Sequence, residues 1–351
     1  MWINSSLEPR AVPWLIGAGL CASVYGWGVD SIAGLLDSPR ARDAFLLRSR
    51  LRPPWSLRIV DEAPLSVAAV VHGSMWVVRD AAEPVRVGEG DVAIFRGPEP
   101  YICADDPATE PQVEIHPGQV CRTPDGREVM PMSDLGIRLW GNDPDVGVGG
   151  GEKSEGPTEL VTGTYQVRTA VSRRLLDTLP ALVVIPAEAL RSPLVGYLAD
   201  EIVRDEPGQE AVLDRLLDLL LVASLRARYA RPDAGAPGWY RANGDPVVGP
   251  ALRLLHHRPA DPWTVESLAA ATGVSRAALA RRFTSLVGEP PMAFLTGWRL
   301  TLAADLLREP GATVESVARQ VGYGSSFALS TAFKRVRGVT PREHRAAALA
   351  W

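Results

Sequence analysis

The segment TVESLAAATGVSRAALARRFTSLVG occupies residues 264–288, and a related segment, TVESVARQVGYGSSFALSTAFKRVRG, occupies residues 313–338. Each begins with a threonine, a residue whose hydroxyl caps the first turn of a helix. Gly273 and Gly322 fall at the same place in the two copies, where a helix end needs a residue that tolerates positive φ. We therefore predict that each segment folds as a short helix, a tight turn and a second helix.

The predicted second helices also match each other. Ser275 opens the first of them and Ser325 the second, which follows one additional loop residue. Each helix carries two apolar anchors on an otherwise polar surface, and these anchors are Leu279 with Phe283 and Leu329 with Phe333. Such a pair of helices is the helix-turn-helix arrangement, whose second helix enters the major groove of DNA. We call residues 264–288 the first head and residues 313–338 the second head.

The segment between the heads has the apolar spacing of one long helix. Residues 289–309 place five large side chains on one helical face, namely Phe294, Leu295, Trp298, Leu302 and Leu306. About 19 helical residues span ~28 Å, close to the ~34 Å between successive major-groove segments on one side of B-DNA. A stiff helix would therefore hold the heads nearly one DNA turn apart. The alternative is a helical bundle in which the repeat is accidental.

The charge distribution agrees with a polyanionic partner for this region. Residues 246–351 contain 13 Lys and Arg against 7 Asp and Glu, a balance of +6, although the whole chain has a net charge of −4. The remaining 245 residues therefore carry −10. A basic region beside an acidic one is typical of a domain that binds nucleic acid.

The middle of the chain has the pattern of short strands. The runs SLRIV, SVAAVV, SMWVVRD, PVRVG, DVAIF and YICA follow one another closely, with further strands expected at 113–115, 119–122, 128–130, 160–168 and 182–185. This spacing predicts a β-sandwich or a small barrel. Before these strands, residues 30–50 are predicted as a short helix. After them, helices are predicted at Ser192–Arg204 and Gln209–Tyr229, and the broad apolar stripe of the second suits either internal packing or dimerisation.

Three segments lack a regular pattern. Residues 11–29 are apolar but rich in Gly and Ala and interrupted by Pro13, so we expect a loose extension or a packed segment and not a membrane anchor. Residues 141–158 are glycine-rich without the context of a phosphate-binding loop, so we expect a flexible loop. Residues 231–245 have the composition of a linker. We divide the chain into an extension (1–29), a sensor and dimerisation domain (30–230), a linker (231–245) and a DNA-binding domain (246–351).

The quoted motifs resemble a known family. WTVESLAAATGVSRAALARRF, VGEPPMAFLTGWRL, VARQVGYGSSFALSTAFKR and PREHR are similar to the DNA-binding domain of the AraC/XylS transcription regulators. DSIAGLLDSPRARDAFLLRS and GEGDVAIFRGPEPYICADD resemble the cupin-type sensor domain of one branch of that family. The resemblance implies a multidomain α+β fold, with a cupin-like β-barrel and flanking helices followed by an all-α domain with two helix-turn-helix units. It implies a sequence-specific cytoplasmic regulator, expected to be an activator, that binds double-stranded promoter DNA and RNA polymerase, with a homodimer and a small-molecule effector as further expectations.

The resemblance also assigns residues to DNA contacts. The family's groove-facing positions correspond to Arg276, Ala277, Ala280 and Arg281 in the first head and to Ser326, Phe327, Ser330 and Thr331 in the second. Arg281 is the expected base-reading residue, because a guanidinium suits guanine O6 and N7. Phosphate or solvent contacts are expected for Arg282, Lys334 and Arg335. Ser275 and Ser325 are expected to cap their helices and to offer backbone amides to phosphate.

The second head departs from the family pattern. Thr331 stands where an arginine is common, and Phe327 occupies another exposed contact position. We therefore expect base reading through hydrogen bonds to depend on the first head, with thymine-methyl contacts and backbone anchoring from the second.

The sensor domain lacks the histidine cluster of a metal-binding cupin. The strand pair offers His72 alone, and Tyr101 stands where the second cupin motif often has histidine. One histidine does not hold a catalytic metal, so we expect no metal and no cofactor. We predict instead a small-molecule pocket lined by side chains such as Trp76 and Phe95. A cupin-type metal enzyme with a DNA-binding tail is the alternative, and an architectural DNA-binding protein is a third class.

Overall fold

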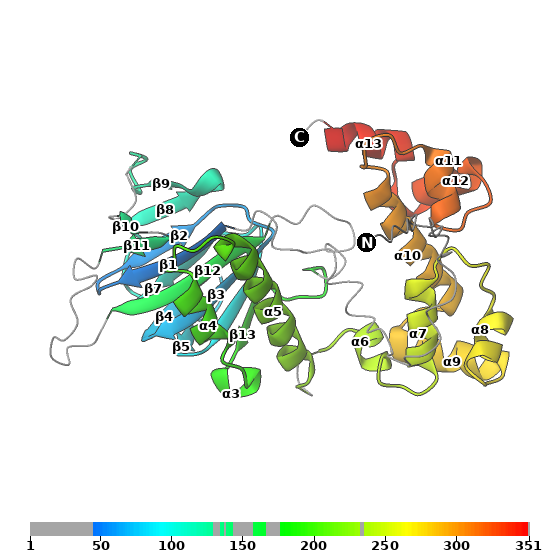
Figure 1. Ribbon diagram of the computed structural model, residues 1–351, viewed down its shortest axis with the longest axis horizontal. Coiled ribbons are helices and arrows are strands. Elements are labelled where there is room, and N and C mark those ends of the chain that lie inside the picture. The colour runs from blue at the N-terminus through cyan, green and yellow to red at the C-terminus, as the bar shows by residue number, and fades with distance from the viewer. Residues whose placement is uncertain are drawn as a thin grey trace, which may run out of the picture.

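The computed structural model describes residues 45–128, 134–136, 138–142, 157–165, 176–231 and 235–349. The predicted extension (1–29) and most of the predicted loop at 141–158 lie outside these residues. Within them, a β-rich N-terminal domain is followed by a helical C-terminal domain (Figure 1), in agreement with the predicted fold class.

Two sheets form the N-terminal domain. One has the strand order β10-β11-β1-β12-β3-β6-β13 and the other β5-β4-β7-β2-β8-β9. The strands are β1 (Phe45–Leu51), β2 (Ser56–Ile59), β3 (Leu65–His72), β4 (Ser74–Val78), β5 (Val85–Gly88), β6 (Val92–Arg96), β7 (Tyr101–Ala104), β8 (Val113–His116), β9 (Val120–Arg122), β10 (Asp134–Gly136), β11 (Leu139–Gly141), β12 (Thr158–Tyr165) and β13 (Leu182–Ile185). The expectation of many short strands is confirmed.

Residues 30–44 of the helix predicted over 30–50 lie outside the described residues, and the prediction is wrong for the remaining residues, 45–50. Residues 45–51 form β1, which pairs antiparallel with β12 and parallel with β11. Leu46 packs into one apolar cluster, whereas Leu47 and Leu51 pack into the other, so this strand carries apolar residues on both of its faces. Apolar residues on both faces hide the period-two alternation that usually identifies a strand.

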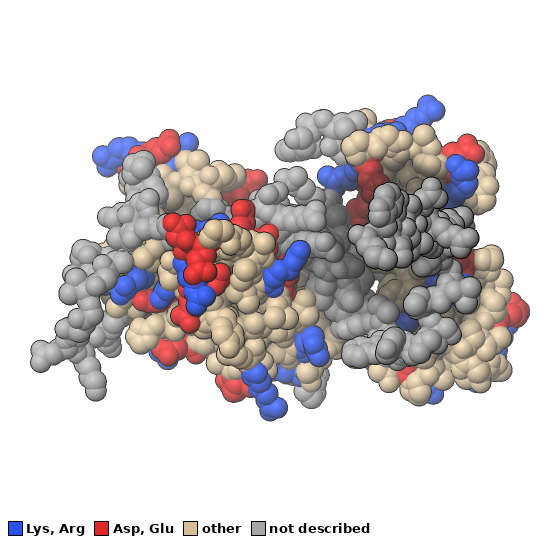
Figure 2. Space-filling view, viewed as in Figure 1, with Lys and Arg blue, Asp and Glu red and all other residues tan. Residues whose placement is uncertain are grey.

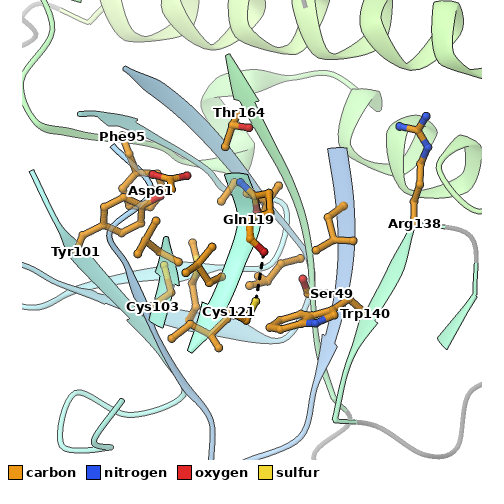
Figure 3. Close-up of a pocket in the computed structure, with 18 of the residues that line it drawn as sticks. Ser49, Asp61, Phe95, Tyr101, Cys103, Gln119, Cys121, Arg138, Trp140 and Thr164 are labelled. Atoms are coloured by element: carbon orange, nitrogen blue, oxygen red, sulfur yellow. Dashed lines mark hydrogen bonds between the residues drawn. The ribbon is translucent and has the colours of Figure 1, made fainter. Parts of the chain in front are cut away.

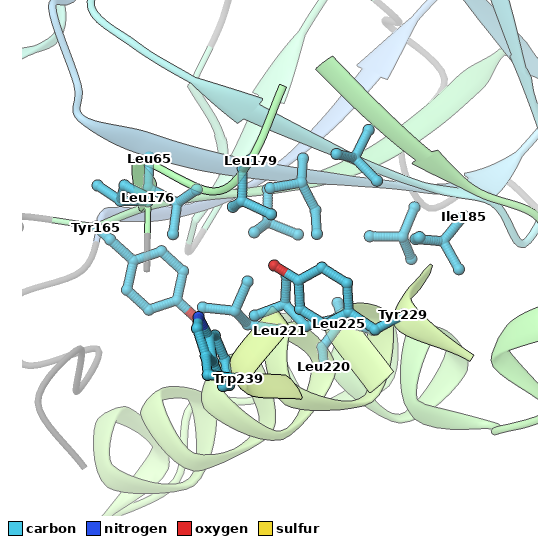
Figure 4. Close-up of a cluster of buried hydrophobic side chains, with 14 of the residues drawn as sticks. Leu65, Tyr165, Leu176, Leu179, Ile185, Leu220, Leu221, Leu225, Tyr229 and Trp239 are labelled. Carbon is cyan, nitrogen blue, oxygen red and sulfur yellow. The ribbon is translucent and has the colours of Figure 1, made fainter. Parts of the chain in front are cut away.

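Helices cover the outer face of the seven-stranded sheet. They are α3 (Ala187–Leu190), α4 (Leu194–Glu201) and α5 (Gln209–Tyr229), and the last two confirm the helices predicted there. Figure 4 shows Leu65 and Leu179 facing Leu221 and Leu225 of α5 across this layer. The inner faces of the two sheets share a separate apolar cluster that includes Trp55 and Met75.

The remaining helices form the C-terminal domain. They are α6 (Gly238–Ala242), α7 (Val248–His257), α8 (Val265–Ala271), α9 (Arg276–Val287), α10 (Pro291–Leu306), α11 (Val314–Gln320), α12 (Ser326–Arg337) and α13 (Pro341–Leu349). Helix α6 lies inside the stretch that composition indicates as a linker, and its Trp239 and Ala242 are buried. Across the described part of the chain, no helix combines the length and apolarity needed to cross a bilayer.

Candidate nucleic-acid interface and sensor cavity

The two heads start with the same hydrogen-bonded cap. The Thr264 hydroxyl accepts from the backbone amide of Ser267 at 3.0 Å, and the Ser267 hydroxyl accepts from the Thr264 amide at 2.9 Å. Thr313 and Ser316 repeat both contacts, each at 3.0 Å. Such reciprocal caps satisfy two backbone donors that a helix start would otherwise leave unpaired. The repeated TVES sequence is therefore a repeated helix start.

Glycines make the turns inside both heads. Gly273 has φ +72° and Gly322 has φ +82°, values that favour glycine because it has no Cβ. The second helices, α9 and α12, then start with the caps Ser275 and Ser325, whose hydroxyls each accept a backbone amide at 3.2 Å. The predicted helix-turn-helix geometry is thus present twice.

Buried anchors orient the two second helices. Leu279 and Phe283 of α9, like Leu329 and Phe333 of α12, have no exposed surface. The opposite faces are open to solvent. These faces carry, exposed or half-buried, all the residues assigned to DNA contacts: Ser275, Arg276, Ala277, Ala280, Arg281, Arg282, Ser325, Ser326, Phe327, Ser330, Thr331, Lys334 and Arg335.

Phe327 is the most exposed large apolar side chain among these, at 81%. Its ring therefore contributes little to the protein's own core and is accessible from solvent. Basic and acidic side chains are interspersed over the end of the molecule formed by α11 and α13 (Figure 2).

Two arginines of α9 are held by carboxylates. Arg276 lies 2.8 Å from Glu266, and both side chains are exposed. Arg282 contacts Asp245 through both its Nε and its Nη2, at 2.7–3.0 Å. The hydrogen bonds from Arg282 lower the pKa of Asp245 to about 2. Arg281 forms no ion pair or hydrogen bond with any residue that the structure describes, so its guanidinium is available for a ligand.

Helix α10 joins the cores of the two heads. Phe294, Leu295 and Trp298 pack with the first head, while Leu300 and Ala303 pack with the second. Its 16 residues correspond to ~24 Å, slightly shorter than expected. The single apolar face predicted for this helix is narrower than its buried surface. Helix α10 is buried on more than one side, because both heads pack against it.

The first head also packs against the sensor domain through α6, which lies between α5 and α7 (Figure 1). The Tyr240 ring lies 4.7 Å from the Tyr229 ring at the end of α5. On the other side, a Cβ added to Gly238 would lie 2.5 Å from the carbonyl oxygen of Leu286, so α6 touches the C-terminal end of α9. The first head and the helical layer of the sensor domain consequently share one apolar cluster, whereas the second head has its own.

The sensor domain has a partly open cavity of about 570 Å³, lined by residues of both sheets. Its wall is mainly apolar (Figure 3), formed by Leu47, Leu57, Ile59, Ala68, Met75, Phe95, Ile115, Leu139, Trp140 and Leu160, with Ser49, Asp61, Tyr101, Cys103, Gln119, Cys121, Arg138, Thr162 and Thr164 as its polar members. The size and composition are those of a site for a small, largely apolar molecule.

Of the two residues predicted to line this cavity, the structure places only Phe95 there. Our placement of Trp76 is wrong. Met75 and Val77 of β4 point into the apolar cluster between the sheets, and strand alternation turns Trp76 to the outer face, where it is half-buried. Met75 takes its place in the wall.

Burial controls the ionisable groups of the cavity. It raises the pKa of the Cys103 thiol to about 12 and also raises the pKa values of Cys121, Asp61 and Tyr101. The Tyr101 ring stacks on Phe95 at 4.0 Å. At neutral pH both thiols and the phenol therefore stay protonated, and the Cys121 thiol donates to the carbonyl oxygen of Gln119 at 3.8 Å.

His72 lies at a strand end, 3.0 Å from Glu89, with both side chains exposed. In the described ranges, no group of three or more His, Cys, Asp and Glu side chains is arranged to hold a metal ion.

Some residues that shape the heads were missed by sequence reasoning. Asp245, which holds Arg282, lies in the predicted linker, and Arg299 of α10 donates to backbone carbonyls near α8. The only sequence signal for Asp245 was its position just before a helix, where aspartate is a common cap.

Comparison with known proteins agrees with this geometry. A cupin family model matches residues 30–230, and a helix-turn-helix domain model matches residues 268–347. Proteins described as AraC-like transcription regulators in Streptomyces lividans and Streptomyces antibioticus are each 34% identical, over 83% and 82% of this chain and 90% and 89% of theirs. A solved structure of the DNA-binding domain of AdpA with a target DNA is 36% identical, covers 30% of this chain and 96% of that chain, and has a TM-score of 0.29. With similarity along most of both chains and two matching domains in the same order, the chain belongs to the AraC-like transcription regulators.

Proposed function

We propose that this regulator binds double-stranded promoter DNA by inserting α9 and α12 into consecutive major-groove segments. The observation that carries the proposal is the repeated unit itself: two capped helix pairs with buried anchors and open outer faces, joined by one continuous helix. In this proposal residues 246–351 bind DNA, residues 30–230 form the sensor and dimerisation domain, and residues 231–245 connect the two domains.

Within the interface, Arg281 reads a base and the second head contributes apolar contacts. Arg281 is exposed on α9 and has a planar guanidinium that can donate two parallel hydrogen bonds to guanine. Phe327 and Thr331 suit thymine methyl groups, because an aromatic ring and a threonine methyl make apolar contacts. Lys334 and Arg335, one turn further along α12, suit phosphates.

The proposal is tested by selecting duplexes from a random pool with the full-length protein and footprinting the best binder. We expect two protected segments about 10 base pairs apart on one side of the duplex. Binding without sequence preference, at equal affinity for selected and scrambled duplexes, would instead support an architectural role. A footprint of one segment would show that only one head reads DNA.

We further propose that the cavity takes a small-molecule effector and that α5 carries a homodimer contact. Val212 and Leu219 of α5 are 44% and 51% exposed, on the side away from the sheet. These side chains lie about two turns apart, at the spacing of a helix–helix seam. Activation through contact with RNA polymerase completes the proposed role, and in vitro transcription from a selected site with and without the protein distinguishes activation from repression.

The rival function, a metal enzyme with a DNA-binding tail, has a direct test. Metal analysis of the purified protein should give far less than one iron or manganese per chain. A stoichiometric metal would revive the enzyme and would require ligands that His72 and Glu89 alone cannot supply.

A further inference from the structure

Arg299 of α10 attaches the connecting helix to the loop that leads into the first head. Its Nε donates to the carbonyl oxygen of Pro259 at 2.6 Å, and its Nη2 donates to the carbonyl oxygen of Asp261 at 2.7 Å. This loop, residues 258–263, runs from α7 to α8. A planar guanidinium with two directed bonds fixes the loop against α10 more rigidly than a single contact would.

The same loop touches the turn of the second head. A Cβ added to Gly322 would lie 2.6 Å from the carbonyl oxygen and 2.7 Å from the Cα of Ala260, so the two backbones are in close contact. The guanidinium of Arg299 also lies 5.9 Å from the centre of the Tyr323 ring, at cation–π distance. Arg299 thus contacts both the loop that leads into the first head and the turn of the second head, and this loop makes a second bridge between the heads beside α10.

A second bridge affects the relative position of the heads, because a small bend in the long helix α10 moves its far end by several ångströms. A tilt of about 10° at one end of a helix of ~24 Å displaces its far end sideways by about 4 Å and rotates the second reading helix by the same angle. Helices bend gently without a large energetic cost. One helix alone would therefore let the second head move relative to the first and reach half-sites at different distances. A second contact between the heads, away from the axis of α10, opposes this movement.

We propose that Arg299 and the contact between Ala260 and Gly322 set the distance between the two reading helices, so that the protein selects operators by the spacing of their half-sites. The proposal rests on the proposed DNA binding and adds a positioning residue that touches no base. Without this bridge, each head would keep its affinity for its own half-site but the pair would tolerate altered spacing.

The test uses the duplex selected by the full-length wild-type protein. Variants of that duplex carry one base pair inserted or removed between the two protected segments, and shorter duplexes carry each half-site alone. The measured quantity is the ratio of affinities for the original and altered spacings. Arg299→Met keeps the aliphatic stem and removes the hydrogen bonds, and Arg253→Met makes the same change on α7, where no described residue pairs with the arginine.

A pair of glycine substitutions isolates the backbone contact. Gly322→Ala and Gly273→Ala both place a side chain at positive φ, +82° and +72°, at equivalent turns of the two heads. Only the alanine at position 322 meets the loop, because nothing lies within 4 Å of a Cβ at Gly273. Any difference between these variants therefore comes from the contact between heads and not from the strained backbone.

We expect the wild-type protein, Arg253→Met and Gly273→Ala to prefer the original spacing at least tenfold. Arg299→Met should reduce this preference to less than threefold and bind each half-site as the wild type does. Gly322→Ala should reduce the preference to the same extent, and any general loss of affinity from its strained turn is measured by comparison with Gly273→Ala. If both retain the tenfold preference, or if the wild type shows none, the bridge does not set the spacing. If Arg299→Met loses half-site binding through misfolding, the ratio for Gly322→Ala decides. A wild-type protein that binds no duplex would overturn the proposed DNA binding itself.

Discussion

Asp245 joins the start of α7 to the reading helix of the first head, and Asp245→Asn removes its charge with little change in shape. The carboxylate accepts the backbone amides of Val247 and Val248, both at 2.9 Å, as well as the guanidinium of Arg282. Asparagine serves as well as aspartate at a helix start, so the amide contacts should survive. The substitution therefore tests the charge pair with Arg282.

The stability effect follows from the pKa of Asp245. Its fall from 3.8 to about 2 corresponds to about 2.4 kcal/mol at 1.36 kcal/mol per pKa unit. The Arg282 side chain is 51% exposed, however, and exposed ion pairs contribute about 0.2–1 kcal/mol because solvent screens them. We expect Asp245→Asn to lower the free energy of unfolding by about 1 kcal/mol at neutral pH. Because the folded-state pKa is lowered, this difference should persist above about pH 4 and disappear as the pH falls towards 2.

Asp245→Asn should strengthen DNA binding, although it lowers the free energy of unfolding. Without the carboxylate, Arg282 becomes free to neutralise a phosphate, and each additional phosphate contact steepens the slope of log K against log salt by about 0.9. Fluorescence anisotropy titrations at several salt concentrations measure this slope. Asp205→Asn, at an exposed position of the sensor domain, removes the same charge and should leave the slope unchanged. An equal slope for Asp245→Asn and wild type would show that Asp245 does not restrain Arg282 in the complex with DNA.

Three further changes probe the heads and the proposed dimer. Arg281→Ala should cost about 1–3 kcal/mol of discrimination between the selected duplex and one with a changed base pair, measured by gel shift; undiminished discrimination would remove Arg281 as a base reader. Phe333→Ala should cost about 3–5 kcal/mol, and because the second head has its own core, hydrogen exchange should rise in residues 313–338 and not in the first head. Leu219→Glu places a charge on the exposed face of α5 and should shift the protein from dimer to monomer in analytical ultracentrifugation; an unchanged mass would exclude this face as the contact.

Local features of the heads were predictable because short-range rules encode them. A threonine cap, a glycine turn and apolar anchors one turn apart all act within one helix pair, and the structure has them in both copies. The restraints on the arginines were not predictable in the same way. Asp245 and Arg282 are 37 positions apart, and Pro259 and Arg299 are 40 positions apart. Such pairs form only when α7, α9 and α10 pack together, and no periodicity of the sequence reports that packing.

The error at Trp76 has a different cause. The run SMWVV of β4 has large apolar residues at consecutive positions, so composition alone does not say which set faces the cavity. A shift of one residue turns every side chain of a strand to the other face. The pairing of β4 with β5 and β7 settles this choice, and that pairing is a property of the whole sheet.

In the part of the chain that the structure describes, the first head packs against the sensor domain and the second head does so only indirectly, and this difference determines what a molecule in the cavity could influence. Strand β12 has one face on the cavity, through Leu160 and Thr162, and on the other it is pressed against α5, where a Cβ on Gly163 would lie 2.6 Å from a methyl group of Leu217. Displacement of β12 by a ligand would therefore be transmitted to α5. From α5 the packed contacts continue through α6 to the end of α9, whereas among the described residues the second head is reached through α10 and the loop that Arg299 holds. A change in the sensor domain consequently acts on the orientation of the first head relative to the sensor domain. If the bridge keeps the two heads together, such a change would move them as one unit, and it would alter where the pair sits on DNA without altering the spacing that the pair reads.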